Sequence, residues 1–298
     1  MRHAKVTHSR VDSNAATPPL CCRSGGVVTM FKPLVLTLAA FAFSTTLAIG
    51  HEFWIDPVDF TLDPGANIQA DIRVGQDFVG SPYAFIPQNF RLFELARGDI
   101  RVAVTGRVGD RPALNQAPLG DGLNVILHVT RDYDVTWKEW DKFTAFLHHK
   151  DADWVAAEHE ASGAPKVDII EAYSRYGKSL VAVGDGAGAD RRYGLLTEIV
   201  ALANPYTDDL SQGLPLQVFY DDKPRDTAQI EVFAKTAEGS VTVNTYRTNA
   251  EGIATIPVEP GMTYLFDTVV LRRPAGDQII KDAQWESLWA SLTVKIPG

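Results

Sequence analysis

The stretch L-N-V-I-L-H-V at residues 123–129 decides the fold class, because it has the period of two that belongs to a β-strand. Every second residue from Leu123 to Val129 is apolar, so these side chains share one face of the strand. Residues 68–74 and 100–108 alternate in the same way, with Gly- and Pro-containing turns between the strands. The spacing predicts a β-sandwich or barrel from residue 51 to about residue 136.

The residues after Pro205 show the same pattern of short strands and tight turns. Several short strands at this spacing are typical of an immunoglobulin-like or transthyretin-like β-sandwich. Asn204-Pro205 marks the expected boundary, which gives an N-terminal domain over residues 51–205 and a C-terminal domain over residues 206–298. The expected C-terminal strands are at 216–220, 230–234, 241–246, 253–258 and 263–271.

Residues 137–181 have a helical period instead and predict a helical insertion in the N-terminal domain. One helical face is expected to carry Trp137, Trp140, Phe143 or Thr144, and Leu147. A second helix is expected from near Pro165, and residues 151–160 are expected to form a short helix or a loop. The apolar face of the second helix would carry Val167, Ile170, Tyr173, Tyr176 and Leu180. The predicted fold class is therefore mainly β with one helical insertion.

Residues 30–50 have the features of a signal peptide. Lys32 gives a positive start, residues 34–47 form an apolar run, and Ala48-Ile49-Gly50 has small residues at the positions that a signal peptidase reads. The run is short for a permanent membrane helix. We expect cleavage after Gly50, a periplasmic protein, and no membrane insertion after cleavage. Residues 1–29 are interpreted as a gene-model extension, with a long polar leader as the alternative.

The charge of the chain is acidic, with 28 Lys and Arg against 37 Asp and Glu. Removal of residues 1–50 takes away five basic residues and one acidic residue, which leaves 23 against 36 and a net charge of −13. Such a surface repels nucleic acids and anionic lipids and attracts cations. Cys21 and Cys22 both precede the apolar run, so the processed chain has no disulfide framework. No catalytic motif is present, and we expect a protein that is not an enzyme.

His51 would be the first residue of the processed chain, where its α-amine and its imidazole can bind one metal ion. The unperturbed pKa values of these groups are about 7.7–8.0 and about 6.5, so both lose a proton easily near neutral pH. Nitrogen ligands favour late first-row ions, Cu²⁺ most and then Ni²⁺, Zn²⁺ and Co²⁺. Glu52 and Asp56 lie nearby in the sequence and could complete the site. The alternative is that His51 is an ordinary residue at a frayed terminus.

His128 and His148 are the other candidate metal ligands. His128 lies opposite the apolar face of its strand, so it either lines a groove between sheets or lies on the surface. His148 follows Trp137 by 11 residues, which returns it to nearly the same helical face and predicts a half-buried side chain. His149 is expected to be solvated, and His159 is expected at a helix C-terminus, where a cation is favoured.

Eight segments in the same order carry a family resemblance over nearly all of residues 51–298. They are H-E-F-W-I-D-P at 51–57, V-G-Q-D-F at 74–78, K-F-T-A-F-L at 142–147, E-A-Y-S-R-Y-G-K-S-L-V at 171–181, E-I-V-A-L-A-N-P at 198–205, the turn series D-K-P at 222–224 with T-N-A-E-G-I-A at 248–254, P-G-M-T-Y at 260–264 and W-E-S-L-W-A-S-L-T at 285–293. Together they resemble a family of periplasmic domains associated with ABC-type cobalt/nickel uptake systems, many members of which have no established function.

The resemblance implies a secreted, non-enzymatic protein that handles Ni²⁺ or Co²⁺, with His51 carried over as a ligand. One departure matters. Many relatives place a His-Met pair in the strand that here reads Thr268-Val269-Val270-Leu271, so this chain lacks one of the family's candidate ligands.

Three functions are therefore compared below. The leading hypothesis is a periplasmic accessory protein for nickel or cobalt uptake, with Cu²⁺ or Zn²⁺ as alternative ions and a membrane metal transporter as partner. The second is a metal-free envelope module for adhesion or carriage of a ligand. The third is a copper oxidase with a histidine brace, which needs a second histidine facing His51, either His128 or His148.

Overall fold

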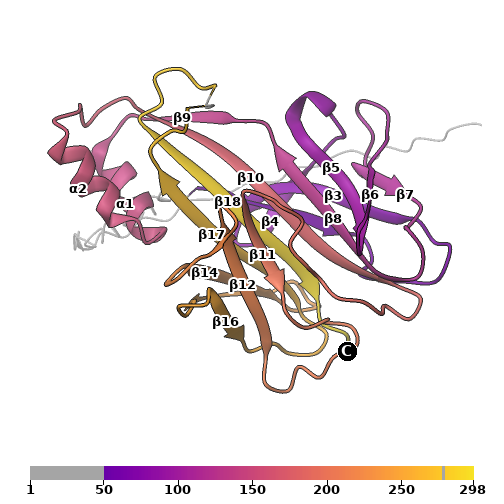
Figure 1. Cartoon of the computed structure of the whole chain (residues 1–298). Coiled ribbons are helices and arrows are strands. Elements are labelled where there is room, and N and C mark those ends of the chain that lie inside the picture. Colours follow the sequence, from indigo (N-terminus) through magenta and orange to yellow (C-terminus); the bar gives the residue numbers. More distant parts are fainter. Residues whose placement is uncertain (1–49, 277–278) are drawn as a thin grey trace, which may run out of the picture. The chain divides into compact units, whose positions relative to one another are not determined.

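Strand β8 (Gly122–Thr130) confirms the strand predicted over residues 123–129, and it lies inside the largest sheet (Figure 1). All nine of its residues are buried. Val125 and Leu127 pack into one apolar cluster, whereas Ile126 packs into another. Successive side chains of a strand point to opposite faces. Other parts of the chain therefore cover β8 on both faces, which the alternation alone did not predict.

The described residues, 50–276 and 279–298, form a mainly β structure, as predicted. The first strands are β1 (Glu52–Pro57), β2 (Thr61–Leu62), β3 (Ile68–Gln76), β4 (Val79–Tyr83), β5 (Phe90–Arg97), β6 (Ile100–Ala103), β7 (Leu114–Gln116) and β9 (Tyr133–Trp137). The later strands are β10 (Ile169–Val183), β11 (Thr197–Ala201), β12 (Leu214–Tyr220), β13 (Lys223–Pro224), β14 (Gln229–Lys235), β15 (Val241–Arg247), β16 (Ile253–Ile256), β17 (Thr263–Arg272) and β18 (Trp285–Lys295). The helices are α1 (Trp140–His149) and α2 (Asp153–Ala161), and a 3₁₀ turn spans Pro87–Asn89.

These strands form one large sheet and two smaller ones. The ten-stranded sheet has the order β15-β14-β17-β18-β10-β8-β5-β6, with β2 and β9 paired to β10. One four-stranded sheet contains β1, β3, β4 and β7, and the other contains β11, β12, β13 and β16. Each small sheet packs on the large one through its own apolar core, so the arrangement is that of two sandwiches that share the large sheet.

The N-terminal core lies between the β1-β3-β4-β7 sheet and the strands β5, β8 and β10. Phe53 and Ile55 of β1 contact this core, and Phe93 and Ile126 contribute to it from the large sheet. The other face of β1 carries Trp54, which packs in a separate cluster with β14 and β17 residues. Strand β1 is therefore buried between the two halves of the chain.

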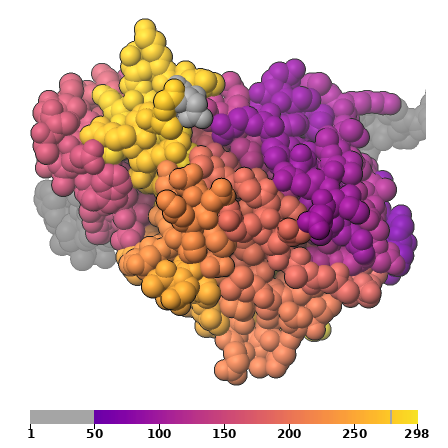
Figure 2. All heavy atoms as spheres, viewed as in Figure 1, coloured from indigo at the N-terminus to yellow at the C-terminus, as the bar shows by residue number. Residues whose placement is uncertain are grey.

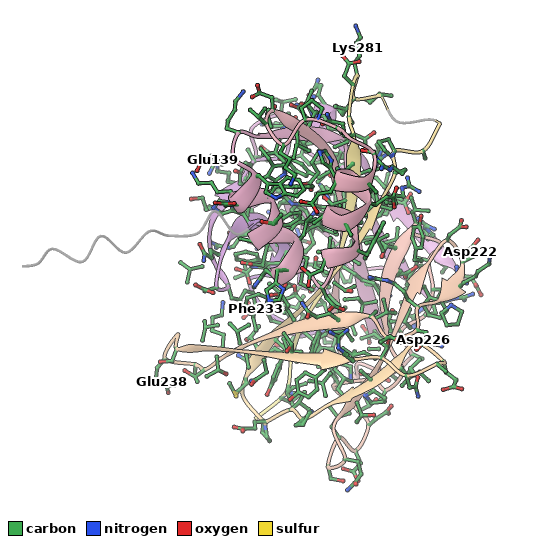
Figure 3. All side chains as sticks on the ribbon, turned by 90° about the vertical axis from the view of Figure 1, so that its left-hand side faces the viewer. Glu139, Asp222, Asp226, Phe233, Glu238 and Lys281 are labelled. Carbon is green, nitrogen blue, oxygen red and sulfur yellow. The ribbon has the colours of Figure 1, made fainter. Side chains whose placement is uncertain are left out.

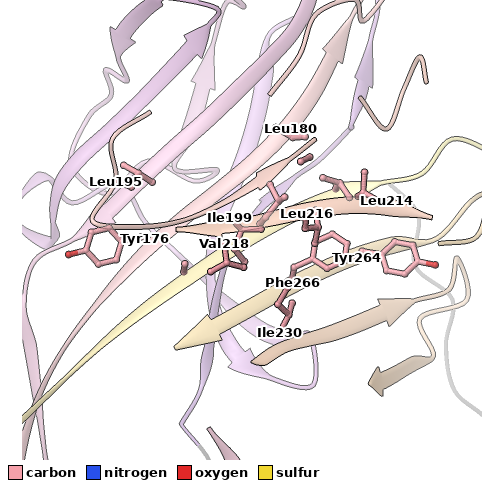
Figure 4. Packing of buried hydrophobic residues seen from close by; sticks show 14 of the residues in the cluster. Tyr176, Leu180, Leu195, Ile199, Leu214, Leu216, Val218, Ile230, Tyr264 and Phe266 are labelled. Atoms are coloured by element: carbon pink, nitrogen blue, oxygen red, sulfur yellow. The ribbon is translucent and has the colours of Figure 1, made fainter. Parts of the chain in front are cut away.

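The C-terminal core lies between the β11-β12-β13-β16 sheet and the other face of the large sheet (Figure 4). Its labelled members include Ile199 and Leu216 from one sheet and Ile230 and Phe266 from the other. Every second residue of β12 from Leu214 to Val218, and of β14 from Ile230 to Ala234, belongs to this core, which confirms the predicted period of two there.

Strand β18 connects the early and late strands of the large sheet. It pairs with β10 in parallel and with β17 in antiparallel register. Figure 2 shows the purple N-terminal residues packed directly against the orange C-terminal ones. The expected boundary near Pro205 falls in the connection between β11 and β12, and the large sheet takes strands from both sides of it. The division into two domains stays a prediction.

The helical insertion is shorter than predicted. Helix α1 confirms the first helix, although it begins at Trp140 while Trp137 ends β9. Helix α2 forms the short helix expected within residues 151–160, and its last turn holds His159, as predicted. His159 is fully buried there and accepts a hydrogen bond from Trp285 Nε1 at 3.0 Å.

The helix expected from near Pro165 is wrong, because residues 169–183 form the long strand β10. From Tyr176 to Val183 the strand is buried at every position, on both faces of the large sheet. Apolar residues therefore occur at both odd and even positions of this strand. The three-residue spacing that suggested a helix is a coincidence of this pattern. Gly177 and Ser179 also disfavour a helix interior.

Residues 1–49, which include the predicted gene-model extension and all but the last residue of the predicted signal peptide, lie outside the described residues. The described residues, from Gly50 onward, belong to one compact unit. In the part of the chain that the structure describes, no helix combines the length and apolarity needed to cross a membrane.

Candidate functional site

His51 lies exposed just before β1, at the meeting point of two cavities. Its backbone carbonyl accepts a hydrogen bond from Arg175 Nη2 at 3.2 Å. His51, Tyr173 and Arg175 line both cavities. We call the cavity of about 350 Å³ that also contains His128 the histidine cavity, and the cavity of about 430 Å³ that also contains Trp137 the aromatic cavity.

His128 is buried beside the histidine cavity and is only 2% exposed. Its ring lies among three phenylalanine rings, with centroid distances of 5.2 Å to Phe53, 5.4 Å to Phe90 and 5.1 Å to Phe93. Of the two alternatives for His128, the groove between sheets is therefore confirmed and the surface position is wrong. The reason is that the β1-β3-β4-β7 sheet covers this face of β8.

The imidazole of His128 is neutral and has a free nitrogen. Burial lowers its pKa to about 3. Its Nδ1 atom is buried and has no hydrogen-bond partner among the described residues. A buried polar atom without a partner costs free energy, so such an atom is a candidate for binding something else. A neutral imidazole is the form that binds metal ions.

The path of β1 brings His51 and His128 to one cavity. Strand β1 passes over β10 at Gly177, where an added Cβ would lie 2.6 Å from Cε1 of Phe53. Only a glycine allows this close approach. Phe53 in turn contacts His128, so the approach of β1 to β10 fixes the start of β1 next to β8.

Glu52 points away from this cavity, because it lies on the opposite face of β1 from Phe53. It lines neither cavity and is buried near Lys150, Glu231 and Asp267. Lys150 forms an ion pair with Glu231 and lies 3.5 Å from Asp267. Burial, helped by the charge of Asp267, raises the pKa of Glu52 to about 8, and Oε2 of Glu52 has no hydrogen-bond partner among the described residues.

Asp56 is also separate from the two histidines. Its carboxylate pairs with Arg73 Nε at 2.7 Å, and Arg73 pairs with Asp71 as well. Burial raises the pKa of Asp56. It lines neither cavity that His51 lines, so sequence proximity to His51 did not translate into a shared site.

The structure does not bring His148 to His51. The His148 side chain is 82% exposed and pairs with Asp153 at 3.1 Å, so the half-buried position predicted for it is wrong. His149 was expected to be solvated, and its side chain is 37% exposed, although it also contacts buried Glu231 at 2.7 Å. The error for His148 arose because the helical phase was counted from Trp137, which belongs to β9 and not to α1.

The aromatic cavity was missed by sequence reasoning. Trp137, Phe146, Tyr173 and Trp289 contribute aromatic side chains to its wall. They come from β9, α1, β10 and β18, which are far apart in the sequence. The family-like segment that contains Trp289 was the one available signal, and it gave no hint of a cavity.

Few side chains at the histidine cavity are of a type that binds metal ions. Among the described residues, no group of three or more His, Cys, Asp or Glu side chains could hold a metal ion. His51 and His128 both line this cavity. A third nitrogen would come from the α-amine of His51 if the chain is cleaved after Gly50.

A family model described as Domain of unknown function (DUF4198) matches residues 48–272. The matched region runs from just before His51 to the end of β17 and leaves β18 outside. No curated protein and no solved structure matches the chain. The match confirms the resemblance to a family of domains without an established function, and the link to cobalt or nickel stays a prediction. Since the match covers more than half of the chain, the protein belongs to the DUF4198 family.

Proposed function

We propose that this protein binds a late first-row transition metal ion, Ni²⁺ or Co²⁺, as an envelope accessory protein for metal uptake and without catalysing a reaction. The observation that supports the proposal best is that His51 and buried His128 line one cavity of about 350 Å³. The metal ion is the cargo, and a membrane transporter is the partner that would receive it.

The chemistry of the two histidines supports this role. The lowered pKa of His128 keeps its imidazole neutral, and no proton has to be displaced from it at pH 7. His51 is exposed and adds a second imidazole. Cleavage after Gly50 would free the amine of His51, and nitrogen donors of this kind prefer ions late in the first transition series. The net charge of −13 over residues 51–298 attracts cations to the surface.

The same pair of histidines also supports a second candidate, a copper site with a histidine brace. That site needs the amine and imidazole of an N-terminal histidine and one further imidazole, which His128 could supply. The two candidates differ in ion preference and in reactivity. A copper oxidase would consume O₂ together with a reducing agent, whereas a nickel or cobalt carrier would not.

The test is calorimetric titration of the periplasmic protein with Ni²⁺, Co²⁺, Cu²⁺ and Zn²⁺, after mass spectrometry has identified its first residue. One variant has an alanine inserted before His51, which blocks the chelate and keeps the side chain. The second is His128→Phe, which retains an aromatic ring among the three phenylalanines. We expect each change to weaken metal binding at least tenfold, because each removes one of few ligands.

His148→Ala is the matched control, because His148 is exposed and lines neither cavity. It should bind metal as the unchanged protein does. Circular dichroism checks that all variants are folded. Unchanged affinity in both the insertion and His128→Phe would contradict the proposed site. A first residue other than His51 would contradict the chelate, and reductant-dependent O₂ consumption with bound copper would favour the oxidase.

A further inference from the structure

We propose that the aromatic cavity is a separate binding site for a small organic anion, an aromatic carboxylate whose carboxylate group pairs with Arg175. This site goes beyond the proposed metal binding and does not depend on it, because its contacts come from side chains on β9, β10, β18 and α1. His51 is shared by the two cavities, so the anion would bind next to the proposed metal site.

The size and wall of the cavity fit such a ligand. A volume of about 430 Å³ lies within the range of about 300–1,000 Å³ that is usual for small-molecule sites. The ring of Phe146 stacks on Trp137 at 5.0 Å and on Trp289 at 6.1 Å. The three rings form a nearly parallel series, since the interplanar angles are 21° and 20°. An apolar, flat body is therefore the complementary part of a ligand.

Buried hydrogen bonds hold this wall in place. Trp137 Nε1 donates to Glu171 Oε2 at 2.7 Å, and Trp289 Nε1 donates to Ser287 Oγ at 2.9 Å. The Ser287 hydroxyl in turn donates to Glu171 Oε1. Both indoles are thus fixed by one buried carboxyl group, and the site is preformed. A preformed site loses little conformational entropy when a ligand binds.

Arg175 supplies the positive charge. Its Nη2 donates to the His51 carbonyl, and its guanidinium carbon lies 4.8 Å from the centroid of the Tyr173 ring. Its Nε atom is buried and has no hydrogen-bond partner among the described residues. Among the described residues no carboxylate lies within ion-pair distance of it, although the buried carboxyl group of Glu171, which also lines this cavity, interacts with its charge. A planar guanidinium with donor capacity to spare matches the geometry of a carboxylate.

The other cations at the cavity are already neutralised. Lys138 pairs with Asp168 at 2.6 Å, and Lys142 pairs with Glu139 at 2.6 Å. Figure 3 labels Glu139, which lies next to the start of α1. Arg175 is therefore the cation of the described cavity wall that forms no ion pair with a carboxylate.

The experiment is calorimetric titration of the full periplasmic protein with 2-naphthoate in the presence of EDTA, so that metal binding plays no part. The neutral isostere 2-naphthamide and the cation 2-naphthylmethylammonium have the same apolar body and serve as comparisons. We expect naphthoate to bind at least tenfold more tightly than either comparison. Arg175→Gln should weaken naphthoate binding at least tenfold and leave naphthamide binding nearly unchanged.

Arg131→Gln is the matched control, because Arg131 lines the histidine cavity and not the aromatic one. It should leave naphthoate binding unchanged. Equal affinity for naphthoate and naphthamide in the unchanged protein would overturn the proposal, even if Arg175→Gln does not fold. Tighter binding of the ammonium would assign the cavity to a cation. Loss of naphthoate binding in Arg131→Gln but not in Arg175→Gln would overturn the proposal and would place the anion in the histidine cavity.

Discussion

At the residue scale, the two cavities depend on ionisable and polar side chains that folding has removed from water. Glu171 is an example. Burial raises its pKa from 4.5 to about 7, although hydrogen bonds from Ser287 and Trp137 act in the opposite direction. Nothing in the sequence distinguishes Glu171 from a surface glutamate. The sequence pattern placed Glu171 in the helix expected from near Pro165, and the strand that forms there instead buries it.

Glu171→Gln tests this description through the pH dependence of stability. The unfolded carboxyl releases its proton near pH 4.5 and the folded one near pH 7, so between these values the unfolded state binds fewer protons. Stability of the unchanged protein should therefore fall as pH rises from 4.5 to 7, by up to about 3 kcal/mol from this group. Glutamine keeps an acceptor for Trp137 and does not titrate.

Urea unfolding of both proteins at pH 5 and pH 8 measures the effect. Other buried carboxyl groups titrate in both proteins, so the difference between the two proteins isolates Glu171. We expect the variant to gain stability relative to the unchanged protein at pH 8 and to lose that advantage at pH 5. A difference that does not change with pH would mean that Glu171 titrates normally.

At the scale of elements, the approach of β1 to β10 positions the candidate site. Gly177 was quoted in the sequence only as part of a family-like segment and was assigned to a helix. Its role appears once β1 is placed, because Phe53 occupies the space where a side chain would be. A pattern of apolar residues can indicate a strand, but not which other strand passes over it, since that contact joins residues more than 100 positions apart.

Gly177→Ala should therefore destabilise the protein by about 1–3 kcal/mol through overpacking. The effect should be smaller in a Phe53→Leu background, where the side chain that clashes is smaller and more flexible. Urea unfolding of the two single variants and the double variant gives the coupling free energy.

Gly276→Ala is the control, because no atom lies within 4 Å of an added Cβ there. It should change the free energy of unfolding little. Independent, additive effects of Gly177→Ala and Phe53→Leu would contradict the close approach of β1 and β10.

At the scale of the whole molecule, the ten-stranded sheet joins segments that the sequence assigned to different domains. Strand β18 lies between β10 and β17, so removal of either half would leave an unpaired edge in the middle of the sheet. The boundary near Pro205 was inferred from a turn and from a change in local pattern. Pairing between β10 and β18 has no local signature, because parallel partners can be any distance apart in the sequence.

The continuous sheet predicts that residues 51–298 unfold in one cooperative step. Differential scanning calorimetry should give a single transition whose calorimetric enthalpy equals the van't Hoff enthalpy. Two independent domains would instead give two transitions. Two transitions, each assignable to one side of Pro205 by limited proteolysis, would support the division that the sequence suggested.

The sequence by itself determined the mainly β fold and the position of the first long helix, because both follow from local periodicity. It also singled out His51 from the predicted cleavage site and His128 from its residue type and strand face. Only the tertiary structure decided that these two histidines line one cavity, that Glu52 points elsewhere, and that Trp137 and Trp289 form a second cavity. The physical reason is that periodicity fixes which side chains share a face, while the packing of distant strands fixes what that face meets.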